Sequence, residues 1–392
     1  MAVRLNAAAD EPTRERLPHA ESLRRMIRSW EAGEHRPSEL YAELYRRAFG
    51  TVTETAFDAA ARGGDDADGI GGFVVADSVL TLDDEERLVR AARAPRRLDS
   101  AVIDSLAVVL AEQRRTEDRI GSVPLIAPVR AQLAVAEKLV SDARGPLRGR
   151  MLDLGGQWAQ FAGWLHASAG RWAEADRHYD RALQWGSEVG NADLIATALN
   201  MKGHLAWLSR TAGPLISLSQ AAQRDRAVSH GVRALAVQQE ARGLALAGEA
   251  DSTDRKFDEA AALTSRAAEH PEDEPPWIYF FGLGYLTLQR GLAYRYLGRY
   301  GEAIELLHRG LQALDPQARR AEWAGAYILQ MAIAHAALGD IEQACSAAGQ
   351  VADIADQTES TRLRAQLLDL HRRLLRVQPR HSAVAVLGER LR

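Results

Sequence analysis

The sequence predicts an all-α protein built from a repeated pair of helices, and three observations lead to this fold class. Strand signals are nearly absent, whereas Ala, Leu, Arg and Glu recur at helical spacing along most of the chain. Gly163, Gly203 and Gly243 are each forty residues apart, and Gly291 and Ala332 continue the series. The segments that follow are also periodic, so that "GRWAEADRHYDRAL" aligns with "GRYGEAIELLHRGL". A period of this length is typical of stacked helical repeats.

Each repeat carries small residues at the positions where two helices must meet. The small residue of the forty-residue series lies in the middle of the first helix, where it lets the second helix approach closely. Gly170, Gly298 and Gly339 are expected to end first helices in a left-handed conformation. The second helix should then begin its buried face at Trp172, Tyr300 and Ile341 and cross the first helix at Ala175, Ala303 and Ala344.

This pattern of helix, tight turn and helix resembles the tetratricopeptide repeat. The resemblance is most specific over residues 163–182 and 291–310. It implies a superhelix whose first helices line a concave face. The period exceeds the usual one of about 34 residues, and we expect the extra length in inter-helix loops such as 267–277. Residues 361–375 are expected to form the closing cap helix, and the apolar stretch 275–286 is expected to be core throughout.

Two short amphipathic patterns, 22–33 and 38–50, occupy the N-terminal end of the chain. Trp30, Glu31, Gly33 and Pro37 have the order and spacing of the second half of a phage-repressor-type helix-turn-helix domain, which this region resembles. The resemblance implies a recognition helix in the DNA major groove. It gives Ser22, Arg24, Arg25 and Arg28 as the DNA-binding candidates.

The combination of such a domain with helical repeats resembles an actinobacterial class of transcription regulators. The family domain has two helices before its recognition helix, whereas only about twenty residues precede it here. Either the true start lies upstream, or the domain no longer binds DNA. The predicted organisation is a partial helix-turn-helix over 1–50, a Gly/Asp-rich linker over 51–82, a helical lead-in over 83–155, and the repeat array with its cap over 156–392.

Composition places the chain among ordinary soluble proteins, with 46% hydrophobic residues, 26% charged residues and a net charge of −4. No apolar run approaches a membrane span, and the first residues lack a signal-peptide core, so we expect a cytoplasmic protein. The single cysteine, Cys345, excludes an intramolecular disulfide and is expected to be buried.

No motif points to catalysis or to a bound cofactor. Phosphate-loop, dinucleotide, zinc-protease and nucleophile-elbow patterns are absent, and no two of the eleven histidines are three or four residues apart. His166, His178 and His335 are expected to be core or groove histidines. We therefore expect neither an enzyme nor a metal or other cofactor.

The register of the repeats gives a set of candidate ligand residues on the concave face. Asn200 lies inside an apolar helical stretch, where a polar residue must hydrogen-bond either another helix or a ligand. The candidates for a peptide or ligand groove are Trp164, Asn200, His204, Trp207, Glu240, Arg295 and Tyr296.

Two functions remain open at this level. The first is a DNA-binding regulator, expected as a homodimer, whose repeats sense a peptide, small molecule or partner protein. The alternative is a tetratricopeptide-type interaction scaffold with a vestigial N-terminus and no DNA contact.

Overall fold

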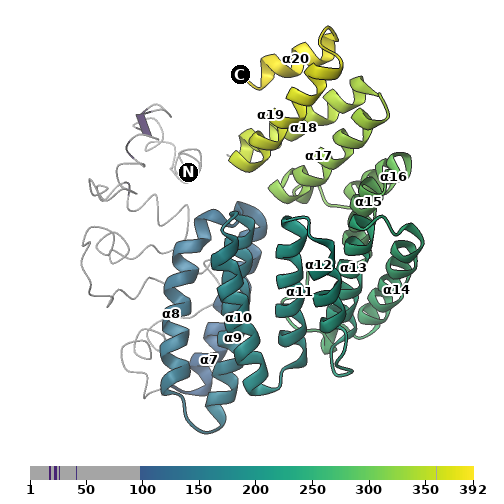
Figure 1. Cartoon of the computed structure of the whole chain (residues 1–392). Helices are drawn as coiled ribbons and strands as arrows, with labels where there is room; N and C mark the ends of the chain where they lie inside the picture. The colour runs from purple at the N-terminus through teal and green to yellow at the C-terminus, as the bar shows by residue number, and fades with distance from the viewer. Residues whose placement is uncertain (1–16, 19–21, 24–25, 27–40, 42–97, 359) are drawn as a thin grey trace. The chain divides into compact units, whose positions relative to one another are not determined.

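The computed structural model describes residues 17–18, 22–23, 26, 41, 98–358 and 360–392. All regular elements in these residues are helical, with fourteen α-helices and three short 3-10 turns (Figure 1). The predicted all-α helical-repeat fold is therefore confirmed. The described residues divide into two compact units. One contains those up to 116 together with 124–162, and the other contains 117–123 and 163–392.

The first unit is a small helical body with its own core. It contains most of α7 (Ser100–Ile120), all of α8 (Ile126–Asp142) and the first part of α9 (Pro146–Ser168). Apolar residues at helical spacing, such as Val109 and Leu110 on α7 and Leu133 on α8, are buried. The buried amides of Gln113 and Gln132 bond to each other between the two helices.

The second unit is the repeat array. Its first helices are α11 (Ala192–Leu208), α13 (His230–Leu246), α15 (Leu283–Tyr296) and α17 (Glu322–Ala337). The corresponding second helices are α12 (Ala212–Ala222), α14 (Ala250–Glu269), α16 (Tyr300–Gln312) and α18 (Ile341–Thr358). The array opens with the end of α9 and α10 (Trp172–Val189) and closes with α19 (Thr361–Val377) and α20 (Ser382–Arg390). First helices contact one another along the array, whereas second helices pack mainly against first helices.

The small residues of the forty-residue series occupy the helix crossings, as predicted. A Cβ atom on Gly243 would lie 2.6 Å from Cγ1 of Ile216, and one on Gly291 would lie 2.9 Å from Cγ of Leu307. Ala175, Ala303 and Ala344 are fully buried on the facing helices. The helices can approach this closely only because these side chains are absent or short.

Left-handed glycines end the first helices, and one repeat breaks this rule. Gly170, Gly298 and Gly339, which were predicted to do so, have φ of 75°, 76° and 81°, and Gly248 has φ of 83°. In the repeat of α11 and α12 the corresponding residue is Arg210, with φ of 57°. A left-handed conformation costs an L-residue roughly 1–2 kcal/mol, so this arginine is strained where glycine would be at ease.

Several sequence-based expectations about burial were wrong. Trp172 opens α10 but is 44% exposed. In the stretch 275–286 Trp277 is buried and donates a hydrogen bond to Thr197 Oγ1 at 3.0 Å, whereas Tyr279 and Phe280 are exposed. These residues lie in a loop, where no helical period separates the inner from the outer side. The cap is also larger than predicted, because α20 follows α19 and both contribute to the last core cluster.

Most of the predicted N-terminal domain and linker lies outside the described residues, and so do Arg24, Arg25 and Arg28. Ser22, Leu23 and Met26 are helical. Leu23 is buried and Ser22 is exposed, as an amphipathic helix over this stretch requires. Cys345 is buried as predicted, and burial raises the pKa of its thiol.

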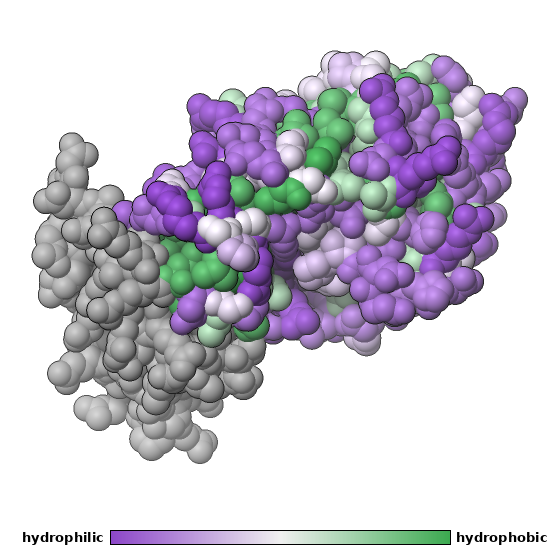
Figure 2. All heavy atoms as spheres, turned by 90° about the horizontal axis from the view of Figure 1, so that it is seen from below, coloured by the Kyte–Doolittle hydropathy of each residue, from purple (hydrophilic) through white to green (hydrophobic). Residues whose placement is uncertain are grey.

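None of the helices in the described part of the chain combines the length and the apolarity that a bilayer-spanning segment needs. On the face shown in Figure 2, hydrophilic residues cover most of the surface and hydrophobic residues form strips between them.

Candidate functional site

The first helices are the place to search for a ligand site because they are buried on several sides yet carry polar residues. Helix α13 packs against α11, α12, α14 and α15 and buries side chains around its whole circumference. Four of the buried side chains in its second half are polar: Gln238, Gln239, Glu240 and Arg242. A buried polar group costs free energy unless it finds a partner. Each polar atom must therefore be traced to one.

The structure brings most of the predicted groove residues into two neighbouring contacts. The ring centroids of Trp164 and His204 lie 5.9 Å apart, and those of Trp207 and Tyr296 lie 4.8 Å apart in an edge-to-face arrangement. The guanidinium carbon of Arg295 lies 4.0 Å from the centroid of the Tyr296 ring. These contacts join α9 to α11 and α11 to α15.

Asn200 is buried one turn before His204 on α11, with 4% of its surface exposed. Its Oδ1 atom has no hydrogen-bond partner among the described residues. The inter-helix hydrogen bond that the sequence left open as an alternative is therefore not made in this part of the chain. Gln238 Oε1 on α13 is also buried without a partner.

Glu240, another predicted groove residue, takes no part in these aromatic contacts. Its carboxylate accepts hydrogen bonds from Gln220 of α12 and from Gln223, the residue after α12, each at 2.9 Å, and pairs with Lys256 of α14 at 3.2 Å. It therefore holds α13 between two second helices. The repeat register placed Glu240 in the groove because it lies forty residues after Asn200, but the register does not give the partners of a side chain.

Sequence reasoning missed Arg242, which is the central charge of the site. Its guanidinium carbon lies 3.9 Å from the centroid of the Trp207 ring, and only 4% of its surface is exposed. Nη1 donates to Gln239 Oε1 at 2.7 Å, while the buried Nε has no partner. Within the described residues no carboxylate lies within ion-pair distance of Arg242. Burial lowers the pKa of its guanidinium, and the nearby rings of Tyr285, Tyr327 and Tyr296 oppose this shift.

We call Arg210, Arg242, Arg295, Trp207 and Tyr296 the arginine–aromatic cluster. The guanidinium carbon of Arg210 lies 5.6 Å from the Tyr296 centroid, so three cations share two aromatic rings. Burial is also the main cause that lowers the pKa of Arg295, and Arg210 adds to it. No ion pair joins any of these three arginines to a described carboxylate. The cluster is therefore a local excess of positive charge.

Arg242 has two counterparts at the same position of other repeats, immediately before the small residue of the series. Lys202 pairs with Asp176 and Asp180 of α10, at 2.5 and 2.7 Å. Arg290 pairs with Asp254 and Asp258 of α14, at 3.3 and 2.7 Å. In both cases the two aspartates are the fifth and ninth residues of the preceding second helix.

The preceding helix of Arg242 lacks these aspartates. Its fifth and ninth residues are Ile216 and Gln220. This difference is visible in the sequence, since "WAEADRHYD" and "ADSTDRKFD" carry both acids and "AGPLISLSQ" carries neither. It could have identified Arg242 had the cations been compared across repeats.

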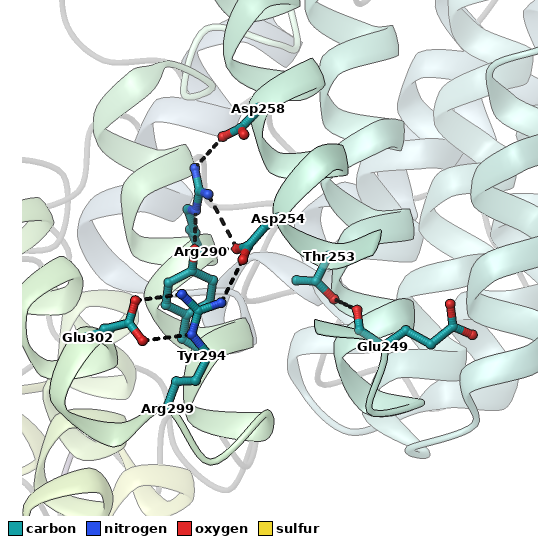
Figure 3. Close-up of polar contacts among 8 residues, drawn as sticks. All are labelled: Glu249, Thr253, Asp254, Asp258, Arg290, Tyr294, Arg299 and Glu302. Atoms are coloured by element: carbon teal, nitrogen blue, oxygen red, sulfur yellow. Dashed lines mark hydrogen bonds and ion pairs between the residues drawn. The ribbon is translucent and has the colours of Figure 1, made fainter. Parts of the chain in front are cut away.

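At Arg290 the cation of this repeat position has its full set of ion-pair partners (Figure 3). Asp254 accepts from Arg290, from Arg299 at 2.7 Å and from the hydroxyl of Tyr294, and Arg299 also pairs with Glu302 at 2.5 Å. Burial disfavours the charged form of Asp254, but these hydrogen bonds outweigh it and lower its pKa. We call Asp254, Asp258, Arg290, Tyr294, Arg299 and Glu302 the aspartate network. Its role is structural, because it joins α14, α15 and the start of α16.

Other polar groups surround the arginine–aromatic cluster. Gln289 donates to the Tyr327 hydroxyl at 2.6 Å, and burial raises the pKa of both Tyr327 and Tyr285. Burial, followed by the charge of Arg242, lowers the pKa of His204 to about 3. His204 is therefore neutral at physiological pH and can donate one hydrogen bond and accept another.

Glu117, near the C-terminal end of α7, adds an acidic side chain beside Trp164. Burial raises the pKa of Glu117, and hydrogen bonds from Ser122 and Trp164 oppose this rise. Trp164 is thus held by Glu117 on one side and His204 on the other. This arrangement makes Trp164 part of the framework of the site.

A separate hollow of about 440 Å³ lies between α16, α17 and α18. Two of its charged side chains are already engaged. Arg319 donates to the backbone carbonyls of Leu314 and Gln312, and Asp353 pairs with Arg390. Among the described residues that line the hollow, no buried polar atom lacks a hydrogen-bond partner, in contrast to the first-helix site.

Comparisons with known proteins add little beyond the fold. No protein-family model matches the sequence, and no curated protein matches it. Among solved structures, BtubC (BKLC) from P. vanneervenii is similar over 61% of this chain and 92% of its own, with 15% identity and a TM-score of 0.42. The hetero-tetramer Cut9-Hcn1 of the APC/C is similar over 95% of this chain and 74% of its own, with 13% identity and a TM-score of 0.38. Likenesses this distant carry no argument about function, which must come from the site itself.

Proposed function

We propose that this protein is a helical-repeat interaction scaffold whose first helices bind a peptide segment of a partner protein. The observation that carries the proposal is the pair of buried acceptors without partners, Asn200 Oδ1 and Gln238 Oε1. A buried acceptor left unpaired costs roughly 1–3 kcal/mol. The two acceptors lie on neighbouring first helices, α11 and α13, and Asn200 is one turn before His204, whose ring contacts that of Trp164.

A peptide matches these groups because its backbone supplies N–H donors at regular spacing and its side chains can pack on the rings. Bound backbone amides would satisfy the two acceptors. A small apolar ligand would leave them unpaired.

The test is a selection of random displayed peptides on the purified full chain. The enriched peptides are labelled and titrated by fluorescence anisotropy against the wild type and the double variant Asn200→Leu/Gln238→Leu. Leucine has a similar volume and removes the acceptors without opening a cavity. We expect the variant to remain folded and to bind about tenfold or more weakly. Enrichment of no peptide, or equal binding by both proteins, would refute the proposal.

A DNA-binding transcription regulator is the second candidate function. It is supported by the resemblance of residues 22–50 to a helix-turn-helix and by the burial of Leu23 beside the exposed Ser22 in helical conformation. In this proposal the protein acts in the cytoplasm as a homodimer, and Arg24, Arg25 and Arg28 contact DNA. A ligand bound to the first helices changes the distance and orientation between the two helix-turn-helix regions of the dimer.

This second candidate predicts binding of DNA from the promoter region of its own gene. Anisotropy titrations on that DNA and on a scrambled duplex, at several salt concentrations, compare the wild type with an Arg24→Ala/Arg25→Ala/Arg28→Ala variant. Specific, salt-dependent binding that the variant loses would support it. Equal binding to both duplexes would refute the regulator function and leave the scaffold as the only one of the two proposed functions.

A further inference from the structure

The arginine–aromatic cluster holds three cations for which the described residues supply no counter-ion, and one of them, Arg242, is buried. Natural proteins almost always pair buried charges, because an unpaired ion in a low-dielectric interior is costly. The same chain obeys this rule at Lys202 and Arg290, each of which has two aspartates. An arginine at the same repeat position without either aspartate is therefore an exception that calls for a reason.

One edge of the Arg242 guanidinium, on which the buried Nε lies, makes no hydrogen bond to any described residue, and we call it the open edge. Gln239 occupies Nη1, and neither Nε nor Nη2 donates to any described residue. Nε and Nη2 form the side of the fork that matches the two oxygens of a carboxylate. The Trp207 ring covers one face of the guanidinium, whose carbon lies 3.9 Å from the ring centroid.

Arg210 adds a second, independent indication. It takes a left-handed conformation that four other repeats give to glycine, and its guanidinium lies over the Tyr296 ring. The strain and the added positive charge both raise the free energy of the unliganded protein. Backbone strain of this kind persists where it contributes to a function.

We propose that the arginine–aromatic cluster is the anchor for an acidic side chain of the partner peptide, whose carboxylate binds the open edge of Arg242. This inference rests on the proposed function and deepens it by naming the peptide as acidic. The free acceptors Asn200 Oδ1 and Gln238 Oε1 take backbone N–H groups of the same peptide. Arg295 and Arg210 extend the positive surface for further acids along it.

A carboxylate fits better than a phosphate at this position. The open edge offers two parallel N–H donors, which satisfy both oxygens of a carboxylate. A phosphate has three charged or accepting oxygens and needs further donors, whereas the neighbouring free groups, Asn200 Oδ1 and Gln238 Oε1, are acceptors.

The test uses the peptides selected on the full wild-type chain and asks whether an Asp or Glu recurs at one position. The strongest binder is titrated against wild type, Arg242→Gln and Arg290→Gln, and again after its acid is replaced by the corresponding amide. We expect Arg242→Gln to bind at least about thirty-fold more weakly and to lose the discrimination between acid and amide. Arg290→Gln should keep both the affinity and the discrimination, although it is less stable.

Stability measurements separate a ligand role from a structural one. Arg242→Gln should be as stable as the wild type or more stable, because the substitution removes an unpaired buried charge. If it unfolds more easily, Arg242 supports the fold and the inference is wrong. The more conservative Arg242→Lys keeps the charge without the bidentate fork and should recover only part of the affinity.

The outcomes also distinguish this inference from the function on which it rests. Enrichment of no peptide refutes both. Enriched peptides without a recurrent acid, or with equal affinity for Arg242→Gln, refute the acidic anchor and leave the scaffold function standing. Glutarate and inorganic phosphate are compared as competitors of the labelled peptide, and displacement by phosphate at much lower concentration would overturn the carboxylate assignment.

Discussion

The arginine–aromatic cluster and the aspartate network use the same repeat position in opposite ways. Arg290 pairs with two aspartates on the preceding second helix and joins α14 to α15, whereas the corresponding residues for Arg242 are Ile216 and Gln220, and Arg242 stacks on Trp207 instead. Each arginine directly precedes the glycine of its repeat, so the two occupy the same position on their helices. The difference lies in two side chains of the preceding second helix. With aspartates there the cation forms ion pairs, and without them it has no ion-pair partner among the described residues.

This difference shows how a repeat protein can acquire a site without changing its fold. Removing two acids from one second helix leaves helix packing intact, because it is held by the small residues at the crossings. The expected experimental differences between the two regions follow in order of decreasing size.

The largest expected difference is between two helix crossings, that of Gly291 beside the aspartate network and that of Gly203 on α11, the helix that carries Trp207. In Gly291→Ala the new Cβ would lie 3.0 Å from the backbone nitrogen of Leu307, which cannot move without displacing α16. In Gly203→Ala the nearest atom is Ser219 Oγ at 3.5 Å, an ordinary contact. We expect the first substitution to cost about 2–3 kcal/mol and the second to be neutral or to stabilise by up to about 1 kcal/mol. Urea unfolding of both variants measures the difference, and equal midpoints would contradict it.

Acidification should destabilise the two regions in different pH windows. The pKa of His204 falls from 6.5 to about 3 on folding, so the unfolded state takes up a proton below pH 6.5 while the folded state does not. Stability is therefore complete above pH 6.5 and falls by up to about 1.4 kcal/mol for each pH unit below it. The lowered pKa of Asp254 acts only below its unfolded value of 3.8.

Unfolding free energies of the wild type and His204→Gln between pH 7 and pH 5 test this window. His178, whose pKa burial and His166 lower to about 4, contributes its own part and should leave a residual slope. The prediction fails if His204→Gln has the same pH dependence as the wild type. Asp254→Asn, as a control, should not change the slope in this range.

Removal of a charge should have opposite effects in the two regions. Asp254→Ala leaves Arg290 and Arg299 with one acid each, and because Asp254 is partly exposed we expect a loss of about 1–2 kcal/mol. Arg242→Gln should cost nothing or stabilise the protein. Thermal or urea unfolding of the two variants beside the wild type decides this, and a loss of similar size in both would erase the distinction drawn here.

The smallest expected effect on stability is at Arg210, the left-handed residue of the arginine–aromatic cluster. Arg210→Gly should stabilise the protein by about 1 kcal/mol, because glycine adopts this conformation without strain. Gly298→Ala, at the corresponding position beside the aspartate network, should destabilise it by a similar amount. The same Arg210→Gly protein should bind the acidic peptide more weakly, so stability and affinity should change in opposite directions.

Much of the fold could be predicted because it depends on local or periodic features. The crossing positions of Gly243 and Gly291 follow from their spacing, and the turn at Gly298 follows from the conformational freedom of glycine. The failures came where no period exists. Tyr279 and Phe280 are exposed because they lie in a loop, and only the surrounding helices determine which side of a loop meets solvent.

The candidate site was only partly predictable. The repeat register placed Trp207, Arg295 and Tyr296 on one side of the array, and the structure joins them. It could not show that Glu240 turns toward Gln223 and Lys256, because a helical period gives the direction of a side chain and not its partner.

The sequence by itself determined the repeated helix pairs, their crossings and their turns, because spacing and small side chains act within one helix and its next neighbour. The sequence shows that Arg242 lacks the two aspartates of the other repeats, but only the tertiary structure decided that it is buried against Trp207 with no carboxylate of the described residues in reach. That property depends on which groups α11, α12 and α15 bring within a few ångströms of its guanidinium, and electrostatic pairing in a low-dielectric interior is a matter of such distances.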